Sequence, residues 1–283
     1  MIHLLDAFQK MDRRWVFLGM VLAILVPLQC PLEADFQVAP EVQDVYDEVE
    51  KLPAGSPVLI SGDFDPASLP EIGPFYTTHL HHLFRNDLKP VLVTLWPASI
   101  PIIYPEMERI ANIYGKEYGT DWIFLGYKEG KELVVKNIGQ NIHQQFPSDH
   151  RKTPIAELPL MKDLRQAKDF PLITSISAGA PGLTEYVLQI QGQYNLNIVG
   201  ACTAVIGPDT IPFHKSGQLS GLSMGMPGSA QYEKLVWKGN PPDGVQLLAT
   251  KSMDVLNVGH LYIIILILLG NVAYFLTRRA KES

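Results

Sequence analysis

The chain has 283 residues, of which 47% are hydrophobic and 18% are charged, and its formal net charge is -6 at pH 7. This acidic balance argues against a nucleic-acid partner, because neutralising phosphates needs clustered lysine and arginine, and the longest basic cluster is His150-Arg151-Lys152. Two cysteines cannot make a zinc site alone. Cys30 and Cys202 stand in such different surroundings that we expect no disulfide, and Cys202 is most simply a buried small residue.

An apolar segment without charges covers residues 15–32 and predicts a first transmembrane helix. A cleavable signal peptide would also have a basic start and an apolar middle. However, the following Gln29-Cys30-Pro31-Leu32-Glu33 lacks a small-x-small cleavage pattern, and Gln29 does not suit a lipoprotein signal, so we expect a retained anchor. Apolar residues at helical spacing over residues 2–11 predict a short interfacial helix within a cytoplasmic tail, residues 1–14.

A second apolar segment covers residues 255–276 and predicts another transmembrane helix, followed by a cytoplasmic tail of residues 277–283. Basic residues precede the first segment and follow the second, whereas residues 33–50, directly after the first segment, contain seven acidic residues and no lysine or arginine. Lysine and arginine favour the cytoplasmic side of a membrane. We therefore predict a two-pass protein of the cell membrane with both termini cytoplasmic and an extracytoplasmic domain over residues 33–254, linkers included. The basic residues are Lys10, Arg13, Arg14, Arg278, Arg279 and Lys281.

Apolar runs alternate with amphipathic stretches through the domain, after an acidic amphipathic helix over residues 41–52. The runs predict strands at residues 57–63, 90–96, 121–126, 171–177 and 197–205. The stretches between them predict helices at residues 72–86, 105–118, 133–146 and 182–194. Continuous apolar runs indicate strands buried on both faces, so we predict an α/β fold: a Rossmann-like three-layer sandwich with a mainly parallel sheet, flanked by N- and C-terminal transmembrane helices.

Three separated patches within residues 55–235 resemble a family of uncharacterised membrane-associated proteins from archaea and deep-branching bacteria. The patches are Gly62-Asp63-Phe64-Asp65-Pro66, Tyr118-Gly119-Thr120-Asp121-Trp122 with Leu125-Gly126-Tyr127, and Ser216-Gly217-Gln218-Leu219-Ser220-Gly221-Leu222 with Ala230-Gln231-Tyr232-Glu233. The resemblance implies a membrane-anchored Rossmann-like protein. It implies no activity, because the family has no established one.

Candidate ligand-binding residues follow the predicted strands at the edge where open α/β sheets bind ligands. Asp63 and Asp65 could hold a divalent cation through oxygen ligands, or could instead open a turn and cap backbone amides. Trp96 is the last residue of the second predicted strand. Ser177, Gly179 and Gly182 follow the fourth, where backbone amides can hold an anion, although tight strand-to-helix turns need glycine in any case.

His79 and His82 could share one face of a predicted helix, as metal ligands must, with His81 between them. The neighbouring Leu80, Leu83 and Phe84 supply the buried stripe of that helix, so we expect solvated or boundary histidines and not a metal site.

Gly217, Gly221 and Gly225 are spaced four residues apart. On one helix they would form a stripe that lets a partner approach closely, and the alternative is a loop with positive φ angles.

The sequence contains no Gly-x-Ser-x-Gly, His-Glu-x-x-His or Cys-x-x-Cys motif, and it identifies no catalytic residue, cofactor or particular metal. Two anchors would hold the domain against the membrane, which suits lateral assembly. We therefore expect a non-catalytic subunit or scaffold of a membrane assembly, with the bilayer and either copies of itself or other membrane proteins as partners. The alternative is an extracytoplasmic ligand-binding or hydrolytic domain that acts at the carboxyl ends of the strands.

Overall fold

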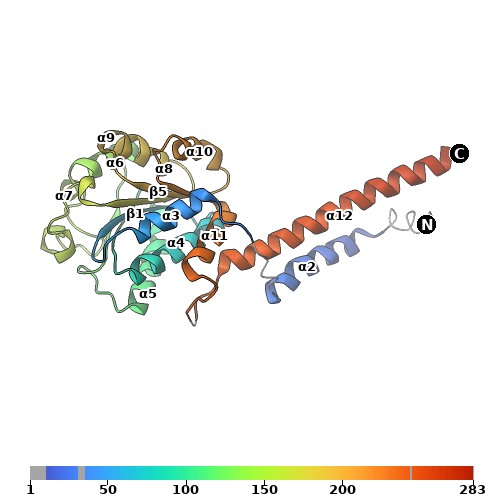
Figure 1. Ribbon diagram of the computed structural model, residues 1–283, viewed down its shortest axis with the longest axis horizontal. Coiled ribbons are helices and arrows are strands. Elements are labelled where there is room, and N and C mark those ends of the chain that lie inside the picture. The colour runs from blue at the N-terminus through green and yellow to red at the C-terminus, as the bar shows by residue number, and fades with distance from the viewer. Residues whose placement is uncertain (1–10, 31–35, 243, 283) are drawn as a thin grey trace. The chain divides into compact units, whose positions relative to one another are not determined.

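A computed structural model describes residues 11–30, 36–242 and 244–282 (Figure 1). The chain divides into two compact units, and residues 36–249 form an α/β domain. The other unit contains the described residues before and after that domain. The interfacial helix predicted for residues 2–11 lies outside the described residues apart from Met11.

The domain is built on one sheet of six parallel strands in the order β3-β2-β1-β4-β5-β6. The strands are β1 (Pro57–Asp63), β2 (Lys89–Thr94), β3 (Ile123–Tyr127), β4 (Leu172–Ser177), β5 (Ile198–Cys202) and β6 (Gly221–Met224). This is the strand order of the doubly wound, Rossmann-like fold. The first five strands confirm the sequence prediction within a few residues.

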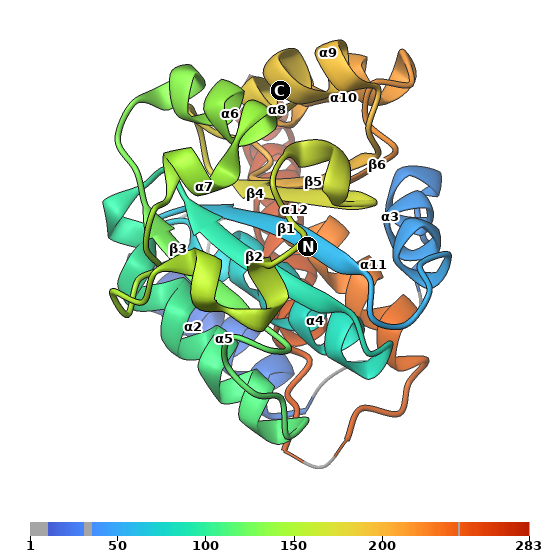
Figure 2. The same cartoon turned by 90° about the vertical axis from the view of Figure 1, so that its left-hand side faces the viewer.

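Helices cover both faces of the sheet, which gives the predicted three layers (Figure 2). One apolar core contains residues from α3 (Pro40–Glu50), α4 (Leu69–Arg85), α5 (Ile100–Ile113) and α11 (Gly225–Trp237). The core on the other face contains residues from α6 (Lys131–Gln140), α7 (Ile142–Gln145), α8 (Leu183–Tyr186) and a π-helical turn (Val187–Gln191), which continues into α9 (Gly192–Tyr194). The short α10 (Gly207–Lys215) connects β5 to β6.

The sixth strand and the helix after it are absent from the sequence prediction. β6 has only four residues, Gly221 to Met224, and a serine- and glycine-rich segment precedes it, so neither length nor apolar content marks it as a strand. It forms because Val199 to Cys202 of β5 supply a ladder on one side and α3 packs over it. Tertiary contacts thus decide this element.

The first residues of the domain are hydrogen-bonded to its last helix, α11. The backbone N–H of Ala39 donates to Oε1 of Gln231 at 2.9 Å, and Nζ of Lys234 donates to the carbonyl of Phe36 at 2.7 Å. Phe36 and Ala39 belong to the start of the domain, whereas Gln231 and Lys234 lie in α11, the last helix before the exit. Contacts between α3 and α11 continue this association.

The second predicted transmembrane segment, residues 255–276, lies within α12 (Leu248–Glu282). Among the described residues, Leu248–Arg278 is the one helix long and apolar enough to cross a membrane, with a mean hydropathy of 2.1. The first predicted segment, residues 15–32, corresponds to α2 (Arg13–Gln29). Its 17 residues measure about 25 Å, which is shorter than the ~30 Å hydrocarbon core of a bilayer. A second span therefore stays a prediction.

Candidate functional site

The sheet places β1 beside β4, at the point where the strand order reverses direction. In open α/β sheets, ligands bind beyond the carboxyl ends of the strands at this switch point. Asp63 at the end of β1 and Ser177 at the end of β4 are partners in the parallel register, and the N–H of Ala178 donates to the carbonyl of Asp63 at 2.9 Å. The fold therefore brings together two candidates that are 114 positions apart in the sequence.

The Asp63 side chain is completely buried. One oxygen accepts from the Ser61 hydroxyl at 2.6 Å, and the other accepts from the Leu95 N–H at 2.6 Å and from the Thr94 hydroxyl at 3.3 Å. Burial raises the pKa of Asp63 to about 7, against the opposing effect of these hydrogen bonds. Asp63 therefore joins β1 to β2 and is poised between its neutral and charged forms near neutral pH.

Asp65 makes a different set of contacts. Its Oδ1 accepts from the backbone N–H of Ser68 at 3.0 Å and from the Ser68 hydroxyl at 2.8 Å, and these bonds hold the pKa of Asp65 below its ordinary value. Asp65 thus caps a turn, which is the alternative that the sequence offered to a cation site. Both carboxylates are occupied by groups of the chain, and the described residues contain no group of three histidines, cysteines or acids that could hold a metal ion.

The indole of Trp96 covers the loop that follows β4. Its Nε1 donates to the carbonyl of Pro181 at 2.8 Å, and a Cβ added to Gly179 would lie 3.5 Å from the ring. Gly182 is required for another reason, since a Cβ there would lie 2.4 Å from Cβ of Ser177. Trp96, Ser177, Gly179 and Gly182 therefore do meet at the switch point.

The backbone amides of this loop are used by the chain itself. The N–H of Leu183 donates to Oγ of Ser177 at 3.1 Å, and the N–H of Gly182 donates to Oε2 of Glu185 at 2.6 Å. These two backbone N–H groups, which were candidates for binding an anion, are thus already paired with side chains of the same chain.

A polar cluster lies beneath α8, on the face of the sheet that carries Ser61 and Asp63. The hydroxyls of Tyr186 and Ser175 are buried there, and neither has a hydrogen-bond partner within the part of the chain that the structure describes. Burial, followed by the nearby carboxylate of Asp63, raises the pKa of Tyr186, and the neighbouring Ser61 hydroxyl opposes this rise. The π-helical turn Val187–Gln191 follows directly, and such turns occur often at functional sites. Unpaired buried hydroxyls indicate a place for water or a ligand atom.

A groove of about 440 Å³ opens between the start of α6 and α8. Its lining contains three glutamates and one lysine and comprises Glu129, Gly130, Lys131, Glu132, Leu133 and Glu185. Glu185 is also the residue that caps Gly182, so the groove borders the loop after β4.

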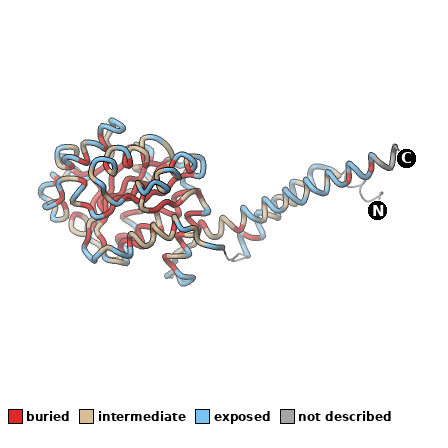
Figure 3. Tube along the Cα trace, turned by 45° about the horizontal axis from the view of Figure 1, so that its top comes forward, coloured by how far each residue is buried: buried red, intermediate tan, exposed pale blue. Residues whose placement is uncertain are grey.

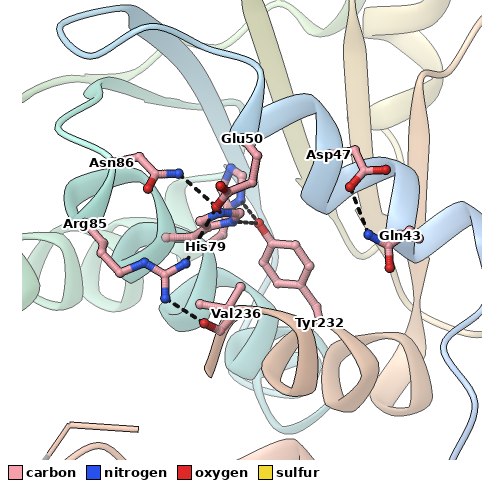
Figure 4. Close-up of polar contacts among 9 residues, drawn as sticks. Gln43, Asp47, Glu50, His79, Arg85, Asn86, Tyr232 and Val236 are labelled. Carbon is pink, nitrogen blue, oxygen red and sulfur yellow. Dashed lines mark hydrogen bonds and ion pairs between the residues drawn. The ribbon is translucent and has the colours of Figure 1, made fainter. Parts of the chain in front are cut away.

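The expectation for the three histidines of α4 is wrong, because all of them are buried. His79 contacts the hydroxyl of Tyr232 through Nδ1 at 2.9 Å (Figure 4). His82 contacts the same hydroxyl through Nδ1 at 2.8 Å. His81 contacts the Tyr114 hydroxyl at 3.1 Å. They are core residues with polar partners and not solvated or boundary residues. No sequence pattern indicates this arrangement, because Tyr232 is 150 positions away from His82.

The chain of hydrogen bonds has a definite direction. The Glu50 carboxylate can only accept, so Nε2 of His82 donates to it at 2.8 Å, and Nδ1 of neutral His82 accepts from the Tyr232 hydroxyl. Tyr232 has a single proton, so its oxygen accepts from Nδ1 of His79. Nε2 of His79 then accepts from the Thr174 hydroxyl at 2.9 Å. We call Thr174, His79, Tyr232, His82 and Glu50 the histidine network, in which hydrogen bonding assigns both tautomers.

Burial lowers the pKa of His79 to about 3 and that of His82 to about 4, which keeps both rings neutral. At the outer end, burial alone would raise the pKa of Glu50, but hydrogen bonds from His82 and Asn86 hold it below its ordinary value. Arg85 lies 3.7 Å from Glu50 and donates to the carbonyl of Val236 (Figure 4). The network thus joins α3, α4, α11 and β4 in one polar arrangement.

The three glycines do not form a stripe on one helix. Gly217 lies in a turn with φ +77°, Gly221 begins β6, and Gly225 begins α11 with φ +61°. A Cβ on Gly221 would lie 2.5 Å from the backbone nitrogen of Val45, so its close partner is α3 of the same chain. Gly221→Leu would therefore disturb the fold itself and would not test an assembly contact.

Comparisons with known proteins assign no family. No protein-family model and no curated protein matches the chain. Among solved structures, a trehalose-6-phosphate synthase, OtsA, aligns with 91% of this chain and 49% of its own length, at 10% sequence identity and a TM-score of 0.30. The chain thus spans about half of that protein. At this TM-score the likeness carries no argument, and the Rossmann-like assignment follows from the strand order alone.

Proposed function

We propose that the chain is a non-catalytic subunit or scaffold of a larger membrane assembly. It crosses the membrane twice, and its extracytoplasmic Rossmann-like domain is the interaction module. The observation that carries this proposal is the apolar surface of α12. Many residues are exposed along this helix (Figure 3), and large apolar side chains are among them. Leu261, Leu268 and Phe275, for example, are 57%, 59% and 63% exposed. A continuous apolar surface of this kind is stable against lipid or protein and not against water.

Contacts between α2 and α12 support a second span. The Tyr262 hydroxyl donates to the carbonyl of Val16 at 2.9 Å, and the Tyr262 ring lies directly over Gly19. Exposed Trp15 and Phe17 give α2 an apolar surface of its own. Two adjacent apolar helices of this kind suit a pair of helices that cross a bilayer side by side.

The carboxyl edge of the sheet supports a binding role over a chemical one. Asp63, Asp65 and Ser177 each accept hydrogen bonds from their own chain, and Trp96 covers the loop between them. Side chains fixed in this way hold the strand ends in a defined conformation.

The first test is the mass of the full-length protein after mild detergent solubilisation and affinity purification, with every co-purifying chain identified. An assembly larger than one chain of 31.5 kDa, homomeric or mixed, is the expected result. A clean monomer in several mild detergents would contradict the proposal.

The orientation can be tested with the chain's own cysteines. Cys30 is exposed at the end of α2, whereas Cys202 is buried. A membrane-impermeant maleimide applied to intact cells should label the wild-type chain but not Cys30→Ser. If labelling requires that the cells be opened, the domain does not lie outside.

The unpaired hydroxyls of Tyr186 and Ser175, close to a carboxyl group with a pKa of about 7, favour a second candidate function. In this alternative the domain binds or hydrolyses a small ligand at the switch point. Melting temperatures measured with MgCl₂, CaCl₂ and a panel of mono- and dinucleotides would test it. A stabilisation that Asp63→Asn abolishes would support binding there, and no shift with any of them would count against it.

A further inference from the structure

The two long sides of α12 have different surroundings. Tyr262 contacts α2. Ala273 follows eleven residues later, which at 100° per residue places it within about 20° of Tyr262 around the helix. Ala273 is completely buried, in agreement with that position. The side of α12 defined by Tyr262 and Ala273 is therefore the inner side of this unit.

The opposite side carries a polar residue within an apolar row. Asn271 follows Tyr262 by nine residues, which places it about 180° away. It is exposed, as are Ile264, Leu268 and Phe275, which lie within about 60° of it on the same side. These four residues, spaced by four, three and four positions, are called the Asn271 face.

Asn271 has hydrogen-bonding capacity that its own helix does not use. Its Nδ2 donates to the carbonyl of Ile267 at 2.9 Å, which takes one of its two amide protons. No donor to its Oδ1 exists among the described residues. Asn271 precedes Arg278 by seven residues, or about 10 Å along the helix, so the carboxamide would lie inside the hydrocarbon layer. A carboxamide that is only partly hydrogen-bonded is unfavourable there, and facing helices commonly satisfy such groups.

We propose that the Asn271 face is the contact between two copies of this chain within the membrane. The inference rests on the proposed membrane-spanning function. Two copies inserted the same way run parallel, so a two-fold axis along the helices places the two Asn271 residues at equal depth. A carboxamide is self-complementary: each can donate its second proton to Oδ1 of the other. The spacing of four, three and four residues is that of helices that cross at a shallow angle.

Disulfide cross-linking in native membranes tests the contact while Asn271 is retained. In a Cys30→Ser, Cys202→Ala background, Leu268→Cys places a thiol on the Asn271 face, and Leu269→Cys places one about 100° away at nearly the same depth. Leu268 and Leu269 are both exposed, at 59% and 45%, so the control thiol is also accessible. After oxidation with copper phenanthroline, Leu268→Cys should give a band of twice the chain mass, at least fivefold more abundant than with Leu269→Cys.

A third comparison isolates the carboxamide. Adding Asn271→Leu to Leu268→Cys should reduce the cross-linked fraction at least fivefold, and Asn271→Gln should restore most of it. Equal cross-linking at positions 268 and 269, or no loss with Asn271→Leu, would overturn the proposal. A cross-linked band of any other mass would identify a different partner and overturn the second copy as the occupant.

Carbonate extraction of the same membranes tests the membrane-spanning function separately from the Asn271 contact. A chain that is retained in the pellet but does not cross-link contradicts the Asn271 face alone. A chain released by carbonate contradicts the membrane-spanning function on which the inference rests.

Discussion

The histidine network and the polar cluster beneath α8 lie on opposite faces of one sheet, and they differ in how fully their hydrogen bonds are satisfied. Adjacent residues of β4 contribute to each: Thr174 donates to His79 on one face, whereas the Ser175 hydroxyl on the other has no partner among the described residues. In the network each proton has an acceptor. A completed network fixes a packing arrangement, and a cluster with spare hydroxyls leaves room for another molecule.

The largest expected difference between the two regions is in how they make the free energy of unfolding depend on acidic pH. Burial lowers the pKa values of His79, His81 and His82 to about 3, about 4 and about 4, below the 6.5 of an unfolded chain. Between pH 6.5 and 4 the unfolded chain therefore binds more protons, and the free energy of unfolding falls as the pH falls, by about 1.4 kcal/mol per unit for each histidine. Urea unfolding of the full-length protein in detergent, followed by tryptophan fluorescence, measures this slope.

Asp63 should act in the opposite direction. Its pKa is raised to about 7 in the folded chain from 3.8, so its contribution to stability is present below pH 3.8 and is lost as the pH rises through 7. Asp63→Asn keeps the shape of the side chain and removes this counter-slope. The pH dependence should steepen by about 1.4 kcal/mol per unit between pH 4 and 7. An unchanged slope would mean that the carboxyl group titrates at an ordinary pKa.

A matched pair of tyrosines gives the next largest effect. Tyr232→Phe leaves Nδ1 of both His79 and His82 without a partner and should lower the free energy of unfolding by about 3 kcal/mol. Tyr186→Phe removes a hydroxyl that has no partner and should change it by less than about 1 kcal/mol. Chemical denaturation at pH 7.5 compares the two. Similar losses in both variants would show that the cluster beneath α8 is also hydrogen-bonded, through water.

The smallest effect is expected from the neighbouring residues of β4. Thr174→Val keeps the side-chain shape but removes the donor to Nε2 of His79, and should lower the free energy of unfolding by about 1.5 kcal/mol. Ser175→Ala should be close to neutral. Nitrogen chemical shifts of the histidine rings provide a second measurement, because Thr174→Val should perturb Nε2 of His79 and Ser175→Ala should not.

The fold could be predicted from sequence where patterns are local. Apolar runs identified five of the six strands and the helices between them, because burial on both faces leaves a continuous pattern. β6 escaped because its four residues form a strand only beside β5 and under α3. The carboxyl edge was also predictable, since strand ends in a parallel sheet converge, and Asp63 and Ser177 do meet there.

The histidine network could not be predicted in this way. Its donors and acceptors come from α3, α4, α11 and β4, and no spacing within α4 distinguishes a ring that meets Tyr232 from one that faces water. The orientation of Asp63 was hidden for a similar reason, because the Leu95 N–H that it accepts from belongs to the neighbouring strand's loop. The residue types showed that these side chains are polar, but their hydrogen-bond partners are determined by the fold.

The bond between Ala39 and Gln231, with the one between Lys234 and Phe36, determines how the domain would carry mechanical load. Tension between whatever is attached before residue 36 and after residue 249 passes first through the contact between α3 and α11. The strand ladders of the sheet lie outside that force path. The sheet can therefore stay folded while the attached segments move. Under high tension, α3 and α11 would be the first elements to separate.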